Sequence, residues 1–279
     1  MKPSVAAPLI FLHVPKTGGT TLNTVINRQF GPGQSYAIRS ADIAGSVERL
    51  KAMPEEQRAG IRLLRGHQAF GLHEFLAPGA RYLGMLRHPL PRVASHYNYV
   101  KSNPGHVLHS ELMARGYDLA GYASSRMCQE LSNGQTRMLA GVWGDRDLNE
   151  DDLQRAIANV EQHFAWLGLA ERFDESLVQL AASLGWTRIY YQKRNVSRVD
   201  SGSLLDRAAA AAISAENQLD LELYAYAQAR FERLSAPARL ARRLGAAGLG
   251  LGNRLLAGVN TLRAGRAEQS VAADSSARS

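Results

Sequence analysis

The sequence lacks the features that identify disulfide-stabilised and membrane-spanning proteins. It contains one cysteine, Cys128, among 279 residues, which excludes an intramolecular disulfide bond and is consistent with a reducing compartment. No apolar run reaches the length of a membrane-spanning helix. The apolar stretch near the N-terminus is short and leads directly into a glycine-rich loop, so we interpret it as a core strand and not as a signal peptide. We therefore expect a cytoplasmic protein.

Acidic side chains are also in short supply, and the deficit lies mainly at the C-terminal end. The net charge is +8, yet residues 236–279 alone contribute +5, from seven arginines against Glu268 and Asp274. Residues 1–235 are close to balanced at +3, so a general nucleic-acid-binding surface is not supported. This division predicts one domain over residues 1–235, followed by a basic tail.

The tail, residues 236–279, has two interpretations. It alternates arginine with alanine, leucine and glycine, which suits either a partly disordered extension or peripheral contact with the inner face of an anionic membrane. Four glycines between positions 245 and 252 oppose a continuous helix, and they favour the extension.

The most informative stretch is LIFLHVPKTGGTTLN, residues 9–23, in which an apolar run meets a glycine-rich loop and then a helical pattern. Folds of the α/β class build phosphate sites in this way, because glycine lets backbone amides approach an anion and a helix N-terminus carries partial positive charge. We predict that Thr20 or Thr21 caps the helix and that Lys16 adds a full positive charge. The alternative is a simple turn with an exposed lysine. The predicted anion-binding residues are Pro15, Lys16, Thr17, Gly18, Gly19, Thr20 and Thr21.

Further apolar runs alternate with helical patterns along the chain. Strands are predicted at residues 9–12, 61–64, 81–86, 166–169 and 188–191, and the main helices at 21–30, 41–53, 91–101, 123–139, 151–163, 173–184 and 204–234. The pattern over 123–139 is interrupted at 132–134, and that over 204–234 divides into two helices near 213–216. This alternation predicts an α/β fold with a central, mostly parallel sheet flanked by helices. Residues 102–120 are poorly patterned, and their composition suits an acceptor-binding loop.

A second candidate anion site follows the strand at residues 81–86. Arg87 comes directly after this strand, and Ser95 lies eight residues later within the next predicted helix. An arginine at the carboxyl end of a strand can bind a phosphate through two hydrogen bonds, and the serine hydroxyl can donate to the same group. The alternative makes Arg87 a surface ion-pair partner and Ser95 a neutral helix residue.

The order of residues in both sites resembles a known family. In PKTGGTT the lysine precedes both glycines, unlike a Walker A loop, and the segment resembles the 5′-phosphosulfate loop of sulfotransferases that use PAPS (3′-phosphoadenosine 5′-phosphosulfate). RHPLPRVAS resembles their 3′-phosphate motif. RGHQAFG, SNGQTRMLAG, GLAERFDESL and QKRNVS are similar to segments of sulfotransferase family 2, in its uronosyl 2-O-sulfotransferase branch. The resemblance covers most of residues 9–200 and excludes residues 236–279.

The resemblance implies a P-loop-like three-layer sandwich and transfer of a sulfuryl group from PAPS to an acceptor hydroxyl, on a carbohydrate or glycolipid. Lys16 then stabilises the leaving phosphate, and His67 in the GH segment is the general base, with Glu74 as the alternative. Lys193 and Arg194 complete the cofactor site or form a solvated basic loop. No metal is expected, because the sequence has no acidic pair at a strand end and no His/Cys ligand spacing.

Two other functions remain open at this point. A nucleotide-dependent kinase is disfavoured by the position of Lys16 and by the missing magnesium ligands. A nucleotide-binding, membrane-associated module without catalysis is disfavoured because the chain retains Lys16, His67, Arg87 and Ser95. The sequence does not reveal the acceptor or the oligomeric state.

Overall fold

The computed structural model describes residues 7–192, 204–235, 245, 247–250 and 253. Within them, five strands form one sheet in the order β2-β3-β1-β4-β5, and every neighbouring pair is parallel. The strands are β1 (Leu9–Leu12), β2 (Ser35–Ala37), β3 (Leu63–Gly66), β4 (Arg81–Leu86) and β5 (Phe164–Leu169). This sheet confirms the predicted parallel α/β fold, with β1 at its centre.

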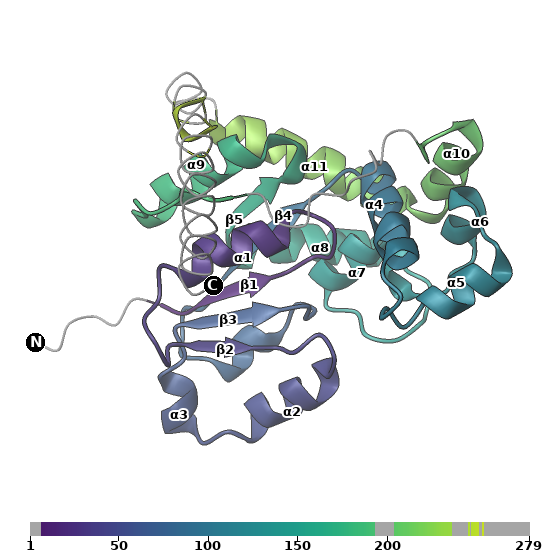
Figure 1. The fold of residues 1–279 in the computed structure, drawn as a ribbon. Helices are drawn as coiled ribbons and strands as arrows, with labels where there is room; N and C mark the ends of the chain where they lie inside the picture. The colour runs from purple at the N-terminus through teal and green to yellow at the C-terminus, as the bar shows by residue number, and fades with distance from the viewer. Residues whose placement is uncertain (1–6, 193–203, 236–244, 246, 251–252, 254–279) are drawn as a thin grey trace, which may run out of the picture.

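Helices connect and cover the strands (Figure 1). The α-helices are α1 (Gly19–Asn27), α2 (Ile43–Ala52), α3 (Glu55–Ala59), α4 (Pro89–Ser102), α5 (His109–Arg115), α6 (Leu119–Ser124), α7 (Gly134–Ala140), α8 (Glu150–His163), α9 (Phe173–Leu184), α10 (Arg207–Glu216) and α11 (Gln218–Ser235). The short 3₁₀ helices are η1 (Leu72–Phe75), η2 (Gln129–Leu131) and η3 (Ala170–Arg172). No helix in the described ranges is both long and apolar enough to span a membrane.

The two faces of the sheet carry separate apolar cores, as the alternation of side chains along a strand requires. On β1, Ile10 and Leu12 pack into a core that includes apolar residues of α2, α8 and α11. Phe11 points to the opposite face and packs into a core with residues of α1 and α9. The resulting three layers confirm the predicted sandwich.

A third apolar cluster lies beside the sheet and joins α4, α5, α6 and α10, which gather on one side in Figure 1. Val93 and Tyr97 of α4, Leu112 of α5, Tyr122 of α6 and Ile213 of α10 are all buried in it. This helical subdomain takes up part of the stretch 102–120 that was predicted to be an unpatterned loop. The prediction was wrong because α5 is short and buries only Leu112, so it leaves little periodicity in the sequence.

Other differences between the predicted and the observed strands and helices have local causes. Residues 188–191 do not form a strand, although Tyr191 is buried against the α1–α9 face. The interruption predicted at 132–134 is confirmed, because Asn133 adopts a left-handed backbone angle, with φ of 49°. A further break that was not predicted lies at Arg126, with φ of 50°. The edge strand β2 escaped prediction because it has three residues and none is fully buried. Most of the tail, residues 236–279, lies outside the described residues, so membrane contact there stays a prediction.

Candidate active site

The loop between β1 and α1 is held in a sharp turn. Thr17 is buried, and its Oγ1 donates to the carbonyl oxygen of Val14 at 2.8 Å. Lys16 and Gly18 have φ of 66° and 81°, so the chain reverses through two left-handed residues and α1 begins at Gly19. Gly18 occupies the N-cap position and offers no side-chain cap to the helix.

The prediction that Thr20 or Thr21 caps this helix is therefore wrong. Both residues lie inside the first turn of α1, because the left-handed Gly18 has already ended the loop. A helix N-terminus without a side-chain cap keeps amide groups available for an anion. Anion binding by this loop stays a prediction, in which the backbone amides of α1 take the place of the threonine hydroxyls.

The structure brings Lys16 and Arg87 together at the carboxyl edge of the sheet. Arg87 Nη1 donates to the carbonyl oxygen of Lys16 at 3.1 Å. Lys16 Nζ lies 4.1 Å from the centroid of the Tyr99 ring. Burial, followed by the charge of Arg87, lowers the pKa of Lys16 to about 8, and burial lowers the pKa of Arg87 too. Two crowded cations beside a helix N-terminus make a strong site for anionic groups.

Ser95 lies on α4, four residues before Tyr99. Residues four apart share one face of a helix, so Ser95 is on the face whose Tyr99 ring packs against Lys16. Its part in binding a phosphate stays a prediction that this placement favours. Lys193 and Arg194, the other predicted cofactor-binding residues, lie outside the described residues.

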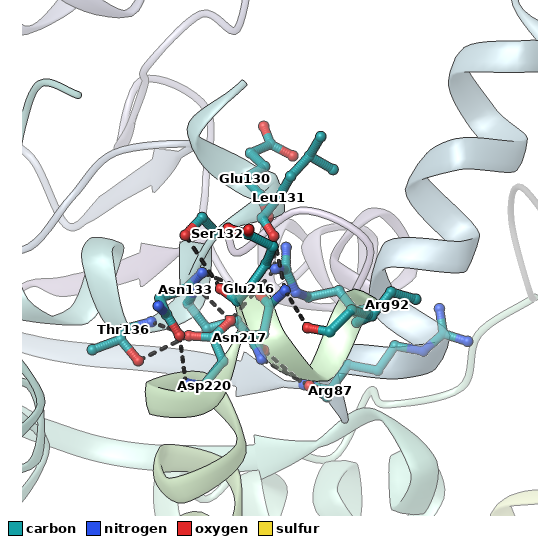
Figure 2. A network of polar contacts seen from close by, with 12 residues as sticks. Arg87, Arg92, Glu130, Leu131, Ser132, Asn133, Thr136, Glu216, Asn217 and Asp220 are labelled. Atoms are coloured by element: carbon teal, nitrogen blue, oxygen red, sulfur yellow. Dashed lines mark hydrogen bonds and ion pairs between the residues drawn. The ribbon is translucent and has the colours of Figure 1, made fainter. Parts of the chain in front are cut away.

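The motif SNGQTRMLAG acquires a role that the sequence did not indicate. Gln135 is fully buried, and its side chain forms two hydrogen bonds with the backbone of Arg87. Gln135 lies in α7, and this helix is fixed to α11 because Asp220 accepts hydrogen bonds from the backbone amides of Gln135 and Thr136 at 3.1 and 2.7 Å (Figure 2). Asp220 also forms a buried ion pair with Arg92 at 3.4 Å. The motif therefore supports the position of Arg87.

His67 directly follows β3, and its ring is oriented by its neighbour His13. His67 Nδ1 lies 2.7 Å from the carbonyl oxygen of His13, and the two rings stack with centroids 4.2 Å apart. A carbonyl can only accept, so Nδ1 carries the proton, and Nε2 of the neutral ring carries the lone pair. Burial and the nearby His67 lower the pKa of His13 to about 3, which keeps His13 neutral. His67 is thus the histidine set up to receive a proton.

His67 lines a pocket of about 130 Å³ together with Pro15 of the phosphate loop. Gln68, Glu130 and Trp143 line the same pocket. Glu74, the alternative base, is exposed on η1 and is not part of this lining. The pocket places a possible proton acceptor beside the anion-binding loop.

Comparison with known proteins identifies the family of this chain. A model of the galactose-3-O-sulfotransferase family matches residues 2–250. The chain belongs to the galactose-3-O-sulfotransferase family. It is 28% identical over 253 residues to the galactosylceramide sulfotransferase of Bos taurus, covering 81% of this chain. It is 27% identical over 257 residues to the galactose-3-O-sulfotransferase 3 of the same species, covering 82% of this chain. The matches span 57% of the length of each relative.

Membership of this sulfotransferase family confirms the predicted resemblance to PAPS-dependent enzymes. PAPS carries phosphate groups at both ends of its ribose, and the chain offers cationic or amide donors at two neighbouring strand ends. Lys16 and the start of α1 follow β1, and Arg87 follows β4, the strand paired with it. The donor set therefore fits a nucleotide with two anionic ends.

One group in the candidate site had no indication in the sequence. His96 of α4 contacts Tyr122 of α6, with Nδ1 2.8 Å from the phenol oxygen, and its Nε2 lies 3.1 Å from Glu130 Oε2. Burial opposes ionisation of Glu130, but His96 and Arg92 outweigh it and lower its pKa to about 2. No sequence signal indicated this carboxylate, because its partners come from helices distant in the chain.

Proposed function

We propose that this protein transfers a sulfuryl group from PAPS to a hydroxyl of a galactose-containing carbohydrate or glycolipid. Family membership supports the reaction class, and the activities for which the two relatives are named support galactose as the acceptor. The observation that carries the proposal is the position of His67, whose Nε2 is available in the pocket that Pro15 of the phosphate loop also lines.

Lys16 and the first backbone amides of α1 provide electrostatic stabilisation in this reaction. When bound, PAPS supplies a sulfuryl group attached to a 5′-phosphate that can leave. Lys16 and the helix N-terminus stabilise negative charge at that phosphate, and a fixed cation in a half-buried site acts more strongly than one in water. Arg87 and Ser95 bind the 3′-phosphate, which fixes the orientation of the nucleotide.

His67 is the general base in this reaction. Its Nε2 accepts the proton of the acceptor hydroxyl, while Nδ1 keeps its hydrogen bond to the carbonyl of His13. That carbonyl stabilises the imidazolium that forms, so the ring needs no rearrangement during the reaction. Glu74 is less suited to this role, because it is exposed on η1 and does not line the pocket.

Calorimetric binding of PAP, the desulfated product, tests the cofactor. Wild-type protein should bind PAP without added metal, and Arg87→Ala should lose most of that affinity. Transfer of label from PAPS to a galactoside then tests the reaction. Absence of PAP binding, together with magnesium-dependent binding of ATP, would overturn the sulfotransferase proposal in favour of a kinase.

A further inference from the structure

The pocket beside His67 contains an unusual share of polar atoms without partners. In the described part of the chain, nine buried side-chain nitrogen or oxygen atoms have no hydrogen-bond partner. Four of the nine belong to residues that line this pocket: Gln68, Arg92, Glu130 and Arg137. Two of these atoms are acceptors, Gln68 Oε1 and Glu130 Oε2, and two are the Nε donors of the arginines. Sugar hydroxyls both donate and accept, so a carbohydrate matches this mixture.

The pocket also has an aromatic surface. Trp143 lines it and is 55% exposed, which is unusual for so large an apolar side chain. Arg137 fixes the backbone that follows, because its guanidinium donates to the carbonyl oxygens of Gly144 at 2.7 Å and Arg146 at 2.8 Å. An exposed indole beside this fixed backbone suits the apolar face of a sugar ring.

The charges of the pocket are unevenly placed. Arg92 is paired with the buried carboxylate of Asp220 and donates to the carbonyl oxygen of Glu130 at 2.7 Å. The Arg137 guanidinium interacts electrostatically with Arg146 and with three carboxylates that do not line the pocket, Asp145, Asp147 and Asp152. Glu130 instead interacts electrostatically with Lys16 and His67. Among the residues that line the pocket, Glu130 is the one carboxylate, and it lies within electrostatic reach of His67.

The Glu130 carboxylate contacts His96, and His96 in turn contacts Tyr122. Burial raises the pKa of the Tyr122 phenol, and its hydroxyl oxygen lies 2.8 Å from His96 Nδ1. The other ring nitrogen, His96 Nε2, faces Glu130 Oε2 at 3.1 Å, and the carboxylate has lone pairs beyond this contact. Glu130 thus stays ionised and keeps capacity to accept a hydrogen bond from a ligand.

We propose that Glu130 is a specificity-determining residue of the acceptor pocket, which accepts a hydrogen bond from a sugar hydroxyl and disfavours sugars that carry a carboxylate. The inference rests on the proposed function, since it assigns this pocket to the acceptor. An anionic sugar would place two negative charges in one half-buried site, and their repulsion costs at least about tenfold in affinity. A neutral sugar meets the carboxylate with a hydroxyl donor.

Two matched probes test the proposal: methyl galactopyranoside and the corresponding methyl galactopyranosiduronate, which differ only at C6. Binding of each is followed by ligand-observed NMR in the presence of saturating PAP. Wild-type protein should bind the neutral probe at least about tenfold more tightly. Glu130→Gln should bring the two affinities within about threefold, and Glu130→Asp should keep the preference. Glu111→Gln, an exposed carboxylate on α5 paired with Arg115, is the control and should match wild type.

Calorimetric titration with PAP establishes that each variant is folded. Equal binding of the two probes to wild type, or an unchanged preference in Glu130→Gln, would overturn the role of Glu130. Label transfer from PAPS is measured separately on the neutral probe. The charge preference with no transfer would support the Glu130 inference and count against the proposed reaction. Transfer to the neutral probe without any charge preference would support the proposed reaction and count against the role of Glu130.

Discussion

Gln135 binds the backbone of Arg87 on both sides. Its Oε1 accepts from the Arg87 amide at 3.0 Å, and its Nε2 donates to the Arg87 carbonyl oxygen at 2.8 Å. A fully buried side-chain amide therefore takes the place of a neighbouring strand at the end of β4. This fixes the point from which the arginine side chain leaves the sheet.

Replacing Gln135 with leucine should weaken recognition of the 3′-phosphate. Both backbone groups of Arg87 would lose their partner inside the protein, and each such loss costs about 1–3 kcal/mol unless the chain moves. Arg87 would then be displaced from the anion site. We expect the affinity for PAP to fall about tenfold or more, while the affinity for AMP, which lacks the 3′-phosphate, changes little. Calorimetry with both nucleotides measures the difference.

Gln154→Leu is the matched control for this experiment. Gln154 is exposed on α8 and bonds only to Glu150, at 2.6 Å, so its replacement should leave both affinities unchanged. Equal losses for PAP and AMP in Gln135→Leu would indicate general damage to the fold, contrary to the role assigned here.

Lys16 should make PAP binding depend on pH. Its pKa is lowered to about 8 in the free protein, so the ammonium loses its proton as the pH rises above that value. A bound phosphate favours the charged form and raises the pKa again. PAP affinity should therefore be constant below about pH 7 once the phosphates are ionised, and fall by up to about tenfold per pH unit above pH 8. Binding near pH 8.5 should be accompanied by proton uptake, measurable by calorimetry in buffers of different ionisation enthalpy.

Lys16→Met should bind PAP weakly and without this pH dependence. The control is Lys101→Met, since Lys101 also lies over a tyrosine, 5.2 Å from the centroid of the Tyr97 ring, but on the exposed end of α4. The control should keep the wild-type profile. A loss of affinity above pH 8 that survives in Lys16→Met would assign the titration to another group.

His67→Gln should separate turnover from cofactor binding. Glutamine can still donate to the carbonyl of His13, but it cannot accept a proton near neutral pH. Loss of a general base lowers kcat by about 10²- to 10⁴-fold, while PAP affinity should stay within about twofold. His109→Gln is the control, because Nδ1 of His109 also lies 2.9 Å from a backbone carbonyl, that of Val100, outside the pocket. If His67→Gln loses PAP binding, His67 belongs to the cofactor site and not to proton transfer.

Local patterns explain which parts of this structure could be predicted. β4 and α9 were predicted with their observed bounds, 81–86 and 173–184, because each is a continuous apolar or amphipathic segment with clear ends. Lys16 was recognised because it lies in the loop after β1, and Arg87 because it directly follows β4; parallel strands bring their carboxyl ends to one edge. These features depend only on neighbours in sequence.

The unpredicted parts depend on contacts between distant segments. Asp220 of α11 meets α7 more than eighty positions earlier in the chain, through hydrogen bonds to Thr136 with a sequence separation of 84. Glu130 becomes a pocket carboxylate only because α4 and α6 place His96 and Tyr122 behind it. Propensity and periodicity carry no information on such pairings, so neither residue had a signal in the sequence.

Gly19 links the phosphate loop to the base, and replacing it with alanine should disturb both. A Cβ at Gly19 would lie 2.0 Å from His13 Nε2, so the His13 ring would have to move. His67 stacks on that ring and bonds to the His13 carbonyl, so its orientation should change as well. We expect Gly19→Ala to lower kcat/KM at least about tenfold, and His13→Ala in the same chain to restore part of the loss by opening space. Gly31→Ala, where the nearest atom would be 3.5 Å away, should have no effect on kcat/KM. If Gly19→Ala is fully active, or if the double variant is no better than the single one, the His13 ring does not couple these two parts of the site.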